Sequence, residues 1–223
     1  MGRALTPAEA ARVYDRIGRL QDWQAFYEGP AVTDLIAQAR LGTATALFEL
    51  GCGTGALAAR LLAEHLPPEA TYLGVDVSPH MVRLSRERLQ RWAGRARVLM
   101  TDGSLPLPGA DGAYSHLLSV YVFDLFSEEY ARALLLEAAR LLEPGGRLCL
   151  VSLTDGDSRA ARLVCRAWSL LWERVPALLG GCRPVDLVPL LEAGWVTEHR
   201  ALVETWGVAS QVIVATPRPT GAT

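Results

Sequence analysis

The sequence predicts a single α/β domain of the doubly wound class, in which helices cover both faces of a mostly parallel seven-stranded sheet that ends in a reversed C-terminal hairpin strand. Three patterns support this fold. Short apolar runs alternate with stretches of helical spacing five times, a glycine-rich loop follows the first run, and three residues separate the last two β-rich stretches. Alternation with short connections implies right-handed crossovers, and hence parallel strands between two helical layers.

The first 42 residues are predicted to be helical. Thr6, Pro7 and Glu9 have the spacing of a capped helix start, and apolar residues continue at helical spacing to about Leu20. A second helix is expected over residues 31–40.

Residues 43–153 are predicted to form the core of the domain. Short apolar runs that end in turn residues are typical of buried parallel strands. Ser78 before Pro79, and Ser127 before two glutamates, have the chemistry of helix N-caps, and Pro144-Gly145-Gly146 ends a helix. The expected strands span residues 46–50, 72–77, 97–101, 114–120 and 147–153, and the expected helices span residues 56–65, 79–92 and 128–142.

The rest of the chain is predicted to add a helical cover over residues 154–194 and a β-hairpin over residues 195–217. Helices are expected at 158–175 and 184–193, and the hairpin strands at 196–204 and 208–215. Only Thr205-Trp206-Gly207 lies between those strands, which favours a hairpin. Because no convincing linker or repeat interrupts the pattern, residues 1–223 are expected to form one domain.

Composition excludes several classes of function. The formal net charge is −2, so nothing draws the chain strongly to nucleic acid or to an anionic membrane. The chain has neither lysine nor asparagine, which excludes mechanisms that need either side chain. No secretion signal is present, and no stretch of about 18 residues is free of charge, so we expect a cytoplasmic protein without a transmembrane segment.

Cysteine and histidine spacing gives no sign of a metal centre. The four cysteines form no CxxC pair and are expected to be reduced thiols, and the four histidines stand singly. These residues are Cys52, Cys149, Cys165 and Cys182, and His65, His80, His116 and His199.

The segment "FELGCGTG", residues 48–55, places glycines 51, 53 and 55 directly after the first predicted strand. In a doubly wound sheet, ligands bind beyond the carboxyl ends of the strands, and glycines let backbone N–H groups face a ligand. The alternative is a tight strand-to-helix turn that binds nothing.

Two carboxylates follow the next strands at the same edge of the sheet. Asp76 ends the second strand, where an acidic side chain accepts hydrogen bonds from the hydroxyls of an adenosine ribose. Asp102 follows the third strand and would accept a hydrogen bond from an adenine amino group. The alternatives are helix capping for Asp76 and an ordinary turn for Asp102.

With these residues in place, the chain resembles a class I S-adenosylmethionine-dependent methyltransferase. The matching motifs are "FELGCGTG", "YLGVDVSPHMV", "VLMTDGSLPLP", "DGAYSHLLSVYVFDLF" and "LLEPGGRLCLVSL", in the family's order and spacing over about residues 46–153. The predicted reversed final strand also fits this family.

The resemblance implies S-adenosylmethionine as cofactor and a set of residues that bind it. The glycine loop, including Cys52, would approach the methionine moiety, and Glu49 would hold its amino group directly or through water. Asp76 would bind the ribose, and Ser119 would border the methionine moiety through its backbone. Val77 and Met81 would pack on the adenine, and Asp102 with Gly103 would meet its edge. The full implied set is Glu49, Gly51, Cys52, Gly53, Gly55, Asp76, Val77, Met81, Asp102, Gly103 and Ser119.

Two other functions remain open from the sequence. Gly51, Gly53 and Ala56 also satisfy the dinucleotide pattern, so an NAD-dependent oxidoreductase is the first alternative. A Tyr-x-x-x-Lys proton relay is absent, because the chain has no lysine. The second alternative is a binding protein without catalytic activity on the same fold.

The catalytic residues are less defined than the cofactor site, because methyl transfer is an in-line displacement on an activated carbon and a general base is optional. Tyr121 and Asp124, in "SVYVFD", are weak candidates for orienting or deprotonating an acceptor, against strand-end packing or helix capping. The segment is not the [DN]PP[YF] signature of many enzymes that methylate bases or protein amides, so no nucleic-acid partner is expected.

The segment "VYDRIGRLQDWQAFYEGP" resembles the one that closes over the cofactor in methyltransferases of the ubiquinone and menaquinone biosynthesis type. Tyr14, Trp23 and Tyr27 are therefore candidates for a lid, with Tyr27 a weak catalytic candidate. Gln21 stands where a tyrosine is common, so quinone methylation is not inferred from this match.

In the helical cover, Arg159, Arg162 and Arg166 share one helical face and apolar residues spread over much of the rest. This region would cover an apolar acceptor pocket, touch lipid as a peripheral membrane contact, or pack on the sheet with its arginines in water. The expected acceptor is a small or lipid-like molecule, and the sequence leaves the acceptor atom and the oligomeric state open.

Overall fold

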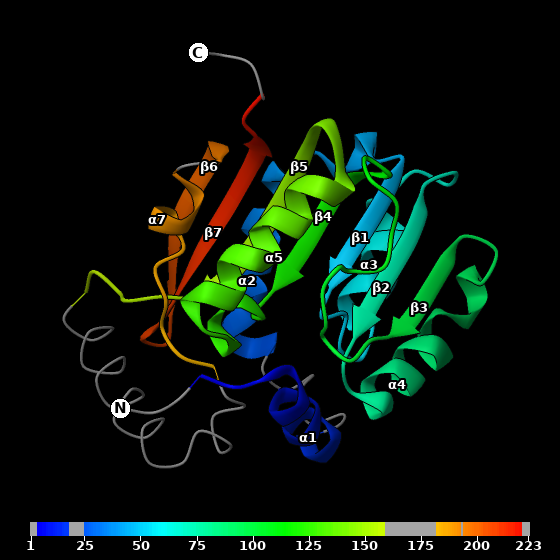
Figure 1. Ribbon diagram of the computed structural model, residues 1–223, viewed down its shortest axis with the longest axis horizontal. Helices are drawn as coiled ribbons and strands as arrows, with labels where there is room; N and C mark the ends of the chain where they lie inside the picture. The colour runs from blue at the N-terminus through cyan, green and yellow to red at the C-terminus, as the bar shows by residue number, and fades with distance from the viewer. Residues whose placement is uncertain (1–3, 18–24, 159–181, 193, 220–223) are drawn as a thin grey trace.

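The computed structural model describes residues 4–17, 25–158, 182–192 and 194–219. Within them, seven strands form one sheet in the order β3-β2-β1-β4-β5-β7-β6 (Figure 1). Neighbours from β3 to β5 are parallel, and β7 is antiparallel to both β5 and β6. The predicted fold class, with its reversed hairpin strand, is therefore confirmed. The strands are β1 (Ala46–Leu50), β2 (Thr71–Asp76), β3 (Ala96–Met100), β4 (Tyr114–Val120), β5 (Leu142–Leu153), β6 (Trp195–Thr205) and β7 (Val208–Pro217).

Helices cover both faces of this sheet. α5 and α7 lie on one face, and α2 and α3 lie on the other (Figure 1). α1 lies beyond the carboxyl ends of β1, β2 and β4 (Figure 1). The α-helices are α1 (Pro7–Ile17), α2 (Ala25–Gln38), α3 (Ala56–Glu64), α4 (Pro79–Leu89), α5 (Glu128–Leu141) and α7 (Val188–Leu191), and the 3-10 helices are η2 (Leu41–Thr43), η3 (Gln90–Trp92) and η4 (Phe123–Leu125).

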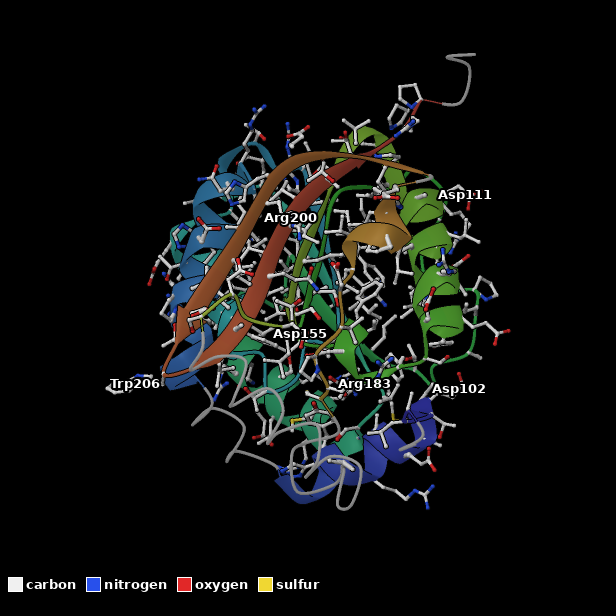
Figure 2. All side chains as sticks on the ribbon, turned by 90° about the vertical axis from the view of Figure 1, so that its left-hand side faces the viewer. Asp102, Asp111, Asp155, Arg183, Arg200 and Trp206 are labelled. Carbon is white, nitrogen blue, oxygen red and sulfur yellow. The ribbon has the colours of Figure 1, made fainter. Side chains whose placement is uncertain are left out.

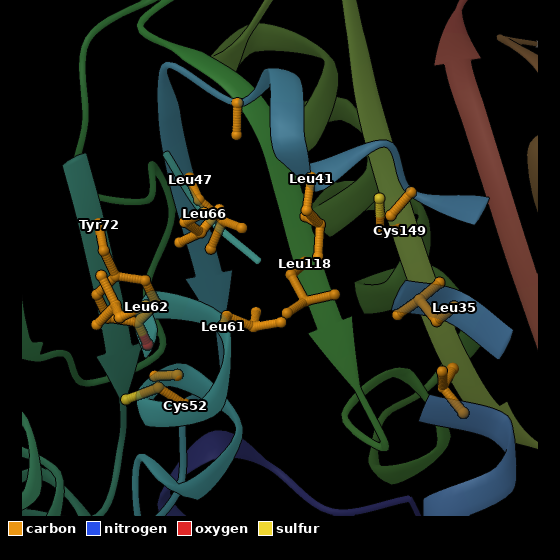
Figure 3. Packing of buried hydrophobic residues seen from close by; sticks show 14 of the residues in the cluster. Leu35, Leu41, Leu47, Cys52, Leu61, Leu62, Leu66, Tyr72, Leu118 and Cys149 are labelled. Carbon is orange, nitrogen blue, oxygen red and sulfur yellow. The ribbon is translucent and has the colours of Figure 1, made fainter. Parts of the chain in front are cut away.

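The core sits in two layers because successive strand residues point to opposite faces. Leu47 and Phe48 on β1 are both completely buried, one in each layer. Figure 3 shows the layer that Leu47 joins, with Leu35 of α2, Leu61 of α3 and Leu118 of β4. A strand buried on both faces is mostly apolar, which is why the strand runs could be recognised in the sequence.

The helix starts follow the predicted capping chemistry. The Thr6 backbone N–H donates to Glu9 Oε2 at 2.8 Å, and the Glu9 N–H donates to Thr6 Oγ1 at 3.3 Å, which is a capping box. The Met81 N–H donates to Ser78 Oγ at 3.1 Å, and the Tyr130 N–H donates to Ser127 Oγ at 3.2 Å.

Some boundaries differ from the prediction. β5 begins at Leu142 instead of Arg147, because Leu142 pairs with Tyr114 before the register shifts around the Pro144-Gly145-Gly146 turn. The expected helix over residues 184–193 is reduced to the single turn of α7. The residues before it are held extended, since the Val185 N–H donates to the Leu153 carbonyl oxygen at 2.9 Å. The expected helix over residues 158–175, with its arginine face, lies outside the described residues except for Ser158.

The hairpin turn is shorter than its three-residue separation in the sequence indicates. Thr205 pairs with Val208, and the two residues between them, Trp206 and Gly207, have φ angles of 54° and 80°. Two successive residues with positive φ are typical of tight hairpin turns whose twist matches that of the strands.

In the part of the chain that the structure describes, no helix has the length and apolarity needed to cross a membrane.

Candidate active site

The glycine loop after β1 forms a backbone that other residues cannot adopt easily. Gly51, Gly53 and Gly55 have φ angles of 75°, 51° and 74°, in the left-handed region. A Cβ atom on Gly51 would lie 2.4 Å from Val122 Cγ2, and one on Gly55 would lie 2.5 Å from Ser85 Oγ. The tight turn predicted as the alternative is therefore real, and it exists together with a cavity that Gly51 and Gly53 line.

Asp76 lies at the end of β2 and is joined to that loop. Its Oδ2 accepts a hydrogen bond from the Gly53 N–H at 2.9 Å, and its Oδ1 accepts one from the Ser78 N–H at 2.9 Å. Burial raises the pKa of Asp76, whereas the N–H donors of Ser78 and Gly53 oppose that rise. The carboxylate is thus fixed in orientation at the mouth of the cavity.

The cavity lies at the carboxyl edge of the sheet and is mostly apolar. α1, the glycine loop, the ends of β2 and β4, the loop after β3, η4 and α5 all contribute to its wall. Among the predicted residues, those that line it are Tyr14, Gly51, Gly53, Asp76, Val77, Gly103 and Tyr121. Residues that the sequence did not point to also line it, including Pro7, Ala10, Leu107, Val122, Leu125, Phe126, Tyr130 and Leu134.

Several predicted residues do not line the cavity, and four of them lie in the glycine loop, in β4 or in the helix after β2. Met81 is completely buried in the core, and Cys52 is buried with its Sγ 3.9 Å from Ser85 Oγ. Gly55 is the N-cap residue of α3. The Ser119 hydroxyl donates to the Leu50 carbonyl oxygen at 3.3 Å. These four residues support the loop and its flanking helices from behind.

Asp102 lies in an ordinary turn, which was the alternative interpretation of this residue. Its Oδ1 accepts hydrogen bonds from the Ser104 N–H at 2.8 Å and the Ser104 hydroxyl at 2.6 Å, which lower the pKa of its carboxyl group. Figure 2 shows Asp102 at the end of the molecule where α1 lies, with Arg183 at the same end. The residue after it, Gly103, reaches the cavity directly.

Gly103 lies in tight contact with α1 and α5, a relationship that no local pattern could reveal. A Cβ atom on Gly103 would lie 2.2 Å from the Cβ of Pro7. The Tyr130 hydroxyl donates a hydrogen bond to the Gly103 carbonyl oxygen, and the Tyr130 ring packs edge-on against Phe126 at 4.9 Å between centroids. The aromatic pair and Pro7 together close this part of the cavity.

Glu49 lies beneath the glycine loop and does not line the cavity. It is buried, and its Oε2 accepts a hydrogen bond from the Tyr72 hydroxyl at 2.5 Å. Burial raises the pKa of Glu49 to about 8, with the nearby Asp76 carboxylate adding to the rise and the Tyr72 hydrogen bond opposing it.

Tyr121 and Asp124 both follow β4, but their side chains have different hydrogen-bond partners. Tyr121 has a φ of 54°, and its hydroxyl hydrogen-bonds with Ser210 Oγ of β7 at 2.7 Å, so that group is directed into the sheet layer. Asp124 is completely buried; its Oδ2 accepts from the Leu153 N–H at 3.2 Å, and its Oδ1 has no partner among the described residues.

The environment of Asp124 favours its protonated form. Burial raises the pKa of Asp124 to about 7, although the Leu153 N–H and the Arg183 charge oppose the rise. The backbone N–H of Arg183 donates to the backbone carbonyl oxygen of Asp124 at 3.1 Å. The residue before Arg183, Cys182, has its Sγ 3.8 Å from the Tyr14 hydroxyl oxygen. Burial also raises the pKa of Tyr14, with contributions from Cys182, Asp124 and Asp76.

The remaining aromatic candidates fall where no side chain is described. Tyr27 lies on α2, and only its backbone is described. Trp23 lies outside the described residues. No group of histidine, cysteine or carboxylate side chains in the described part of the chain is arranged to hold a metal ion.

Comparison with known proteins identifies the core. Residues 47–146 match the family model of the methyltransferase domain. These residues form a methyltransferase domain. They include the glycine loop, Asp76, Gly103 and Asp124, so the cavity is built mainly by this domain, with α1 completing it.

Two curated relatives align with part of this chain. The biotin biosynthesis bifunctional protein BioCD of Bordetella avium (strain 197N) is 34% identical over 133 residues, which are 60% of this chain and 27% of the relative. The demethylmenaquinone methyltransferase of Tropheryma whipplei (strain Twist) is 36% identical over 102 residues, which are 46% of this chain and 39% of the relative. The chain thus spans well under half the length of either relative. The names of the two relatives describe different enzymes.

The fold extends beyond the methyltransferase domain to the whole chain. The crystal structure of the [4+2]-cyclase SpnF superposes with a TM-score of 0.71 and covers 99% of both chains at 19% identity. Identity this low indicates a shared fold and leaves the reaction to be argued from the site.

Proposed function

We propose that this protein is an S-adenosylmethionine-dependent methyltransferase that acts on a small-molecule or lipid-like acceptor. The observation that carries the proposal is the fixed carboxylate of Asp76, held by the Gly53 N–H at 2.9 Å beside a cavity within a methyltransferase domain. An acidic side chain at the end of the second strand is where a nucleoside ribose is bound in doubly wound sheets.

Asp76 remains able to bind a ribose although both of its oxygens are already hydrogen-bonded. Each carboxylate oxygen has two lone pairs. The Gly53 and Ser78 N–H groups use one on each, and the Val77 N–H also donates to the carboxyl group. The remaining capacity would accept from the ribose hydroxyls. Val77 and Gly103 would then border the adenine, and Gly51 and Gly53 the methionine moiety, because all four line the same cavity.

The charge of the site suits a cation. Glu49, Asp76 and Asp124 are carboxyl groups at or behind the cavity wall, and burial raises the pKa of each. A sulfonium and an ammonium group would favour the ionised form of such carboxyls, so cofactor and site would stabilise each other.

The bound cofactor would supply an activated methyl carbon, and the protein would supply orientation and exclusion of water. Leu107, Leu125, Phe126 and Leu134 give the cavity apolar walls, and α1 forms one side of it. These walls favour an acceptor with a substantial apolar part.

We further propose that Asp124 receives the proton of the acceptor. Its Oδ1 has no partner among the described residues. Asp124 does not itself line the cavity, but Leu125, the next residue, and Val122, two residues before it, do. The bound cofactor would supply the methyl carbon to the acceptor oxygen or nitrogen and would be left as its thioether, and Asp124 would receive the proton that the acceptor loses. A pKa of about 7 matches this task.

Two alternatives are less well supported. An NAD-dependent oxidoreductase would need a proton relay, and the chain has no lysine to complete Tyr-x-x-x-Lys. A binding protein of this fold without catalytic activity is the other alternative, and no observation on the described residues favours it.

Isothermal titration calorimetry tests the proposal. S-adenosylmethionine and its demethylated product, S-adenosylhomocysteine, should release heat on binding, and NAD should not. Absence of heat with both adenosyl compounds, together with binding of a nicotinamide dinucleotide, would overturn the proposal. Incorporation of a labelled methyl group into small-molecule extracts, but not into nucleic acid, would then distinguish methyl transfer from binding alone.

A further inference from the structure

A buried tyrosine lies along β2 and reaches the glutamate of the glycine-loop motif. Tyr72 and Gly74 are two residues apart on β2 and therefore point to the same face, and Gly74 is the register partner of Glu49 on β1. A Cβ atom on Gly74 would lie 2.5 Å from the Tyr72 hydroxyl oxygen. The tyrosine side chain therefore passes over Gly74, where it has room only because that residue has no side chain.

The hydroxyl of Tyr72 lies directly beneath the glycine loop. A Cβ atom on Gly74 would also lie 2.9 Å from the Cβ of Cys52, which belongs to that loop. In Figure 3, Tyr72 extends along β2 toward Cys52. Tyr72 is 2% exposed and Glu49 is 3% exposed, so their 2.5 Å hydrogen bond is shielded from solvent.

Packing does not require this hydroxyl. A phenylalanine would fill nearly the same space in the apolar layer that Tyr72 joins, and burying a hydroxyl is unfavourable unless it is hydrogen-bonded. The feature that the hydroxyl adds is a fixed orientation for the Glu49 carboxyl group, through a bond to Oε2 only.

We propose that Tyr72 is a positioning residue for the cofactor: its hydroxyl holds Glu49 so that the other carboxyl oxygen, Oε1, attracts the amino group of the methionine moiety, directly or through water. This inference rests on the proposed function, since it assumes that an S-adenosyl amino acid binds along the glycine loop. It assigns to Tyr72 and Gly74 a role in selecting adenosyl ligands that carry an amino-acid end.

The electrostatics of the pair agree with this role. Burial raises the pKa of Glu49 to about 8, whereas the Tyr72 hydrogen bond favours the ionised form that attracts an ammonium group. Without the hydroxyl, the carboxyl group would lose both its orientation and part of its tendency to ionise when the ligand arrives.

Two thioether ligands that differ in their amino-acid end test the inference. S-adenosylhomocysteine carries that end, and 5′-methylthioadenosine lacks it. Calorimetry on the wild type, Tyr72→Phe and Tyr114→Phe would give both affinities. Tyr114 is a suitable control because it also packs against the sheet, edge-on to Phe48 of β1. It is the first residue of β4, and the cavity lies at the opposite, carboxyl end of that strand.

For Tyr72→Phe we expect the affinity for S-adenosylhomocysteine to fall about 5- to 10-fold, as loss of a typical hydrogen bond does, with little change for 5′-methylthioadenosine. Tyr114→Phe should change neither affinity. In a Glu49→Gln background, Tyr72→Phe should have little further effect, because Tyr72 acts through Glu49.

The outcomes separate this inference from the proposed function. If the wild type binds neither ligand, the proposed function fails. If the wild type binds S-adenosylhomocysteine but Tyr72→Phe leaves the ratio of the two affinities unchanged, the function stands and the role of Tyr72 is wrong. An equal loss of both affinities would likewise show that Tyr72 only supports the fold.

Discussion

The Ser78 hydroxyl donates a hydrogen bond to Oδ1 of Asp15 at 2.6 Å, which joins the C-terminal part of α1 to the start of α4. The same oxygen accepts from the His80 N–H at 3.3 Å. At the other end of α1, the Leu5 N–H donates to the Leu125 carbonyl oxygen at 3.0 Å. α1 is therefore attached on both sides of the cavity that it helps to enclose.

Asp15→Ala should loosen α1. We expect the free energy of unfolding to fall by about 1 kcal/mol, because a carboxylate at a helix N-terminus and its hydrogen bond are lost. Dissociation of S-adenosylhomocysteine should become several-fold faster, as stopped-flow measurements would show. Asp111→Ala, which removes an exposed partner of Arg140, is the control and should leave the dissociation rate unchanged. An unchanged rate in Asp15→Ala would mean that α1 does not limit ligand exit.

Asp76→Ala should weaken cofactor binding by about 1.5–3 kcal/mol, because a charged acceptor is lost. Asp76→Asn should have a smaller effect, since its amide oxygen still accepts one hydrogen bond. Asp102→Ala is an instructive comparison: its carboxylate is used by Ser104, so we expect a smaller loss than at Asp76. Calorimetry measures all three. Equal affinity in wild type and Asp76→Ala would place the ribose elsewhere.

Asp124→Asn should lower kcat by about 100-fold or more, as loss of a general base does, while the affinity for S-adenosylhomocysteine stays within error. The pH profile of kcat/KM, which reports the pKa values of the free protein, gives a second criterion. With a pKa of about 7, Asp124 is active as a base only when ionised, so wild-type kcat/KM should rise with pH through about 7. That rise should disappear in Asp124→Asn. A variant that keeps both kcat and the rise would remove Asp124 from the mechanism.

Glu49 should make stability depend on pH in the direction opposite to that of most carboxylates. Its folded pKa, about 8, is above its unfolded value of about 4.5. The folded state therefore holds a proton that the unfolded chain has lost, so this contribution to stability is complete below pH 4.5 and is lost as pH rises through about 8. Glu49→Gln removes the dependence.

Urea unfolding at pH 5 and pH 9 measures this effect. The free energy of unfolding of Glu49→Gln, relative to that of wild type, should be higher at pH 9 than at pH 5. The expected increase is on the order of a few kcal/mol, at about 1.4 kcal/mol per pKa unit. Glu128→Gln, in the exposed first turn of α5, is the control and should show no such gain. If Glu49→Gln and wild type differ in free energy of unfolding by the same amount at pH 5 and at pH 9, the pKa of Glu49 is not raised.

Gly51→Ala should be strongly destabilising. Its φ of 75° disfavours a side chain, and the new Cβ would lie 2.4 Å from Val122 Cγ2, so we expect a loss of about 2 kcal/mol or more in the free energy of unfolding. Gly94→Ala is the matched comparison, since a Cβ there meets nothing within 4 Å. A thermal melt of each variant measures the difference, and equal melting temperatures would contradict the packing argument.

Much of the fold was predictable because its signals are local. β1 and β4 have the predicted bounds, since a run buried on both faces and bounded by turn residues has few alternatives. Gly51, Gly53 and Asp76 were identified for the same reason: each lies at a strand end, where the topology itself brings side chains together.

The parts that were missed depend on contacts between distant residues. Tyr72 reads as an ordinary strand residue, and its bond to Glu49 exists only after β1 and β2 pair. Tyr14 was a lid candidate and does line the cavity, but Pro7 and Ala10 read as one face of a helix, and nothing local indicates that they line it too. The short α7 has a similar cause, because the extended chain before it is held by a hydrogen bond to Leu153 at the end of β5.

The position of β7 in the sheet determines when, during translation, the domain can complete its folding. β7 is the last of the seven strands to leave the ribosome, yet it lies inside the sheet, between β5 and β6. Until it arrives, β5 has an open edge and a nascent chain cannot complete its sheet, so folding has to finish after nearly the whole domain has been translated.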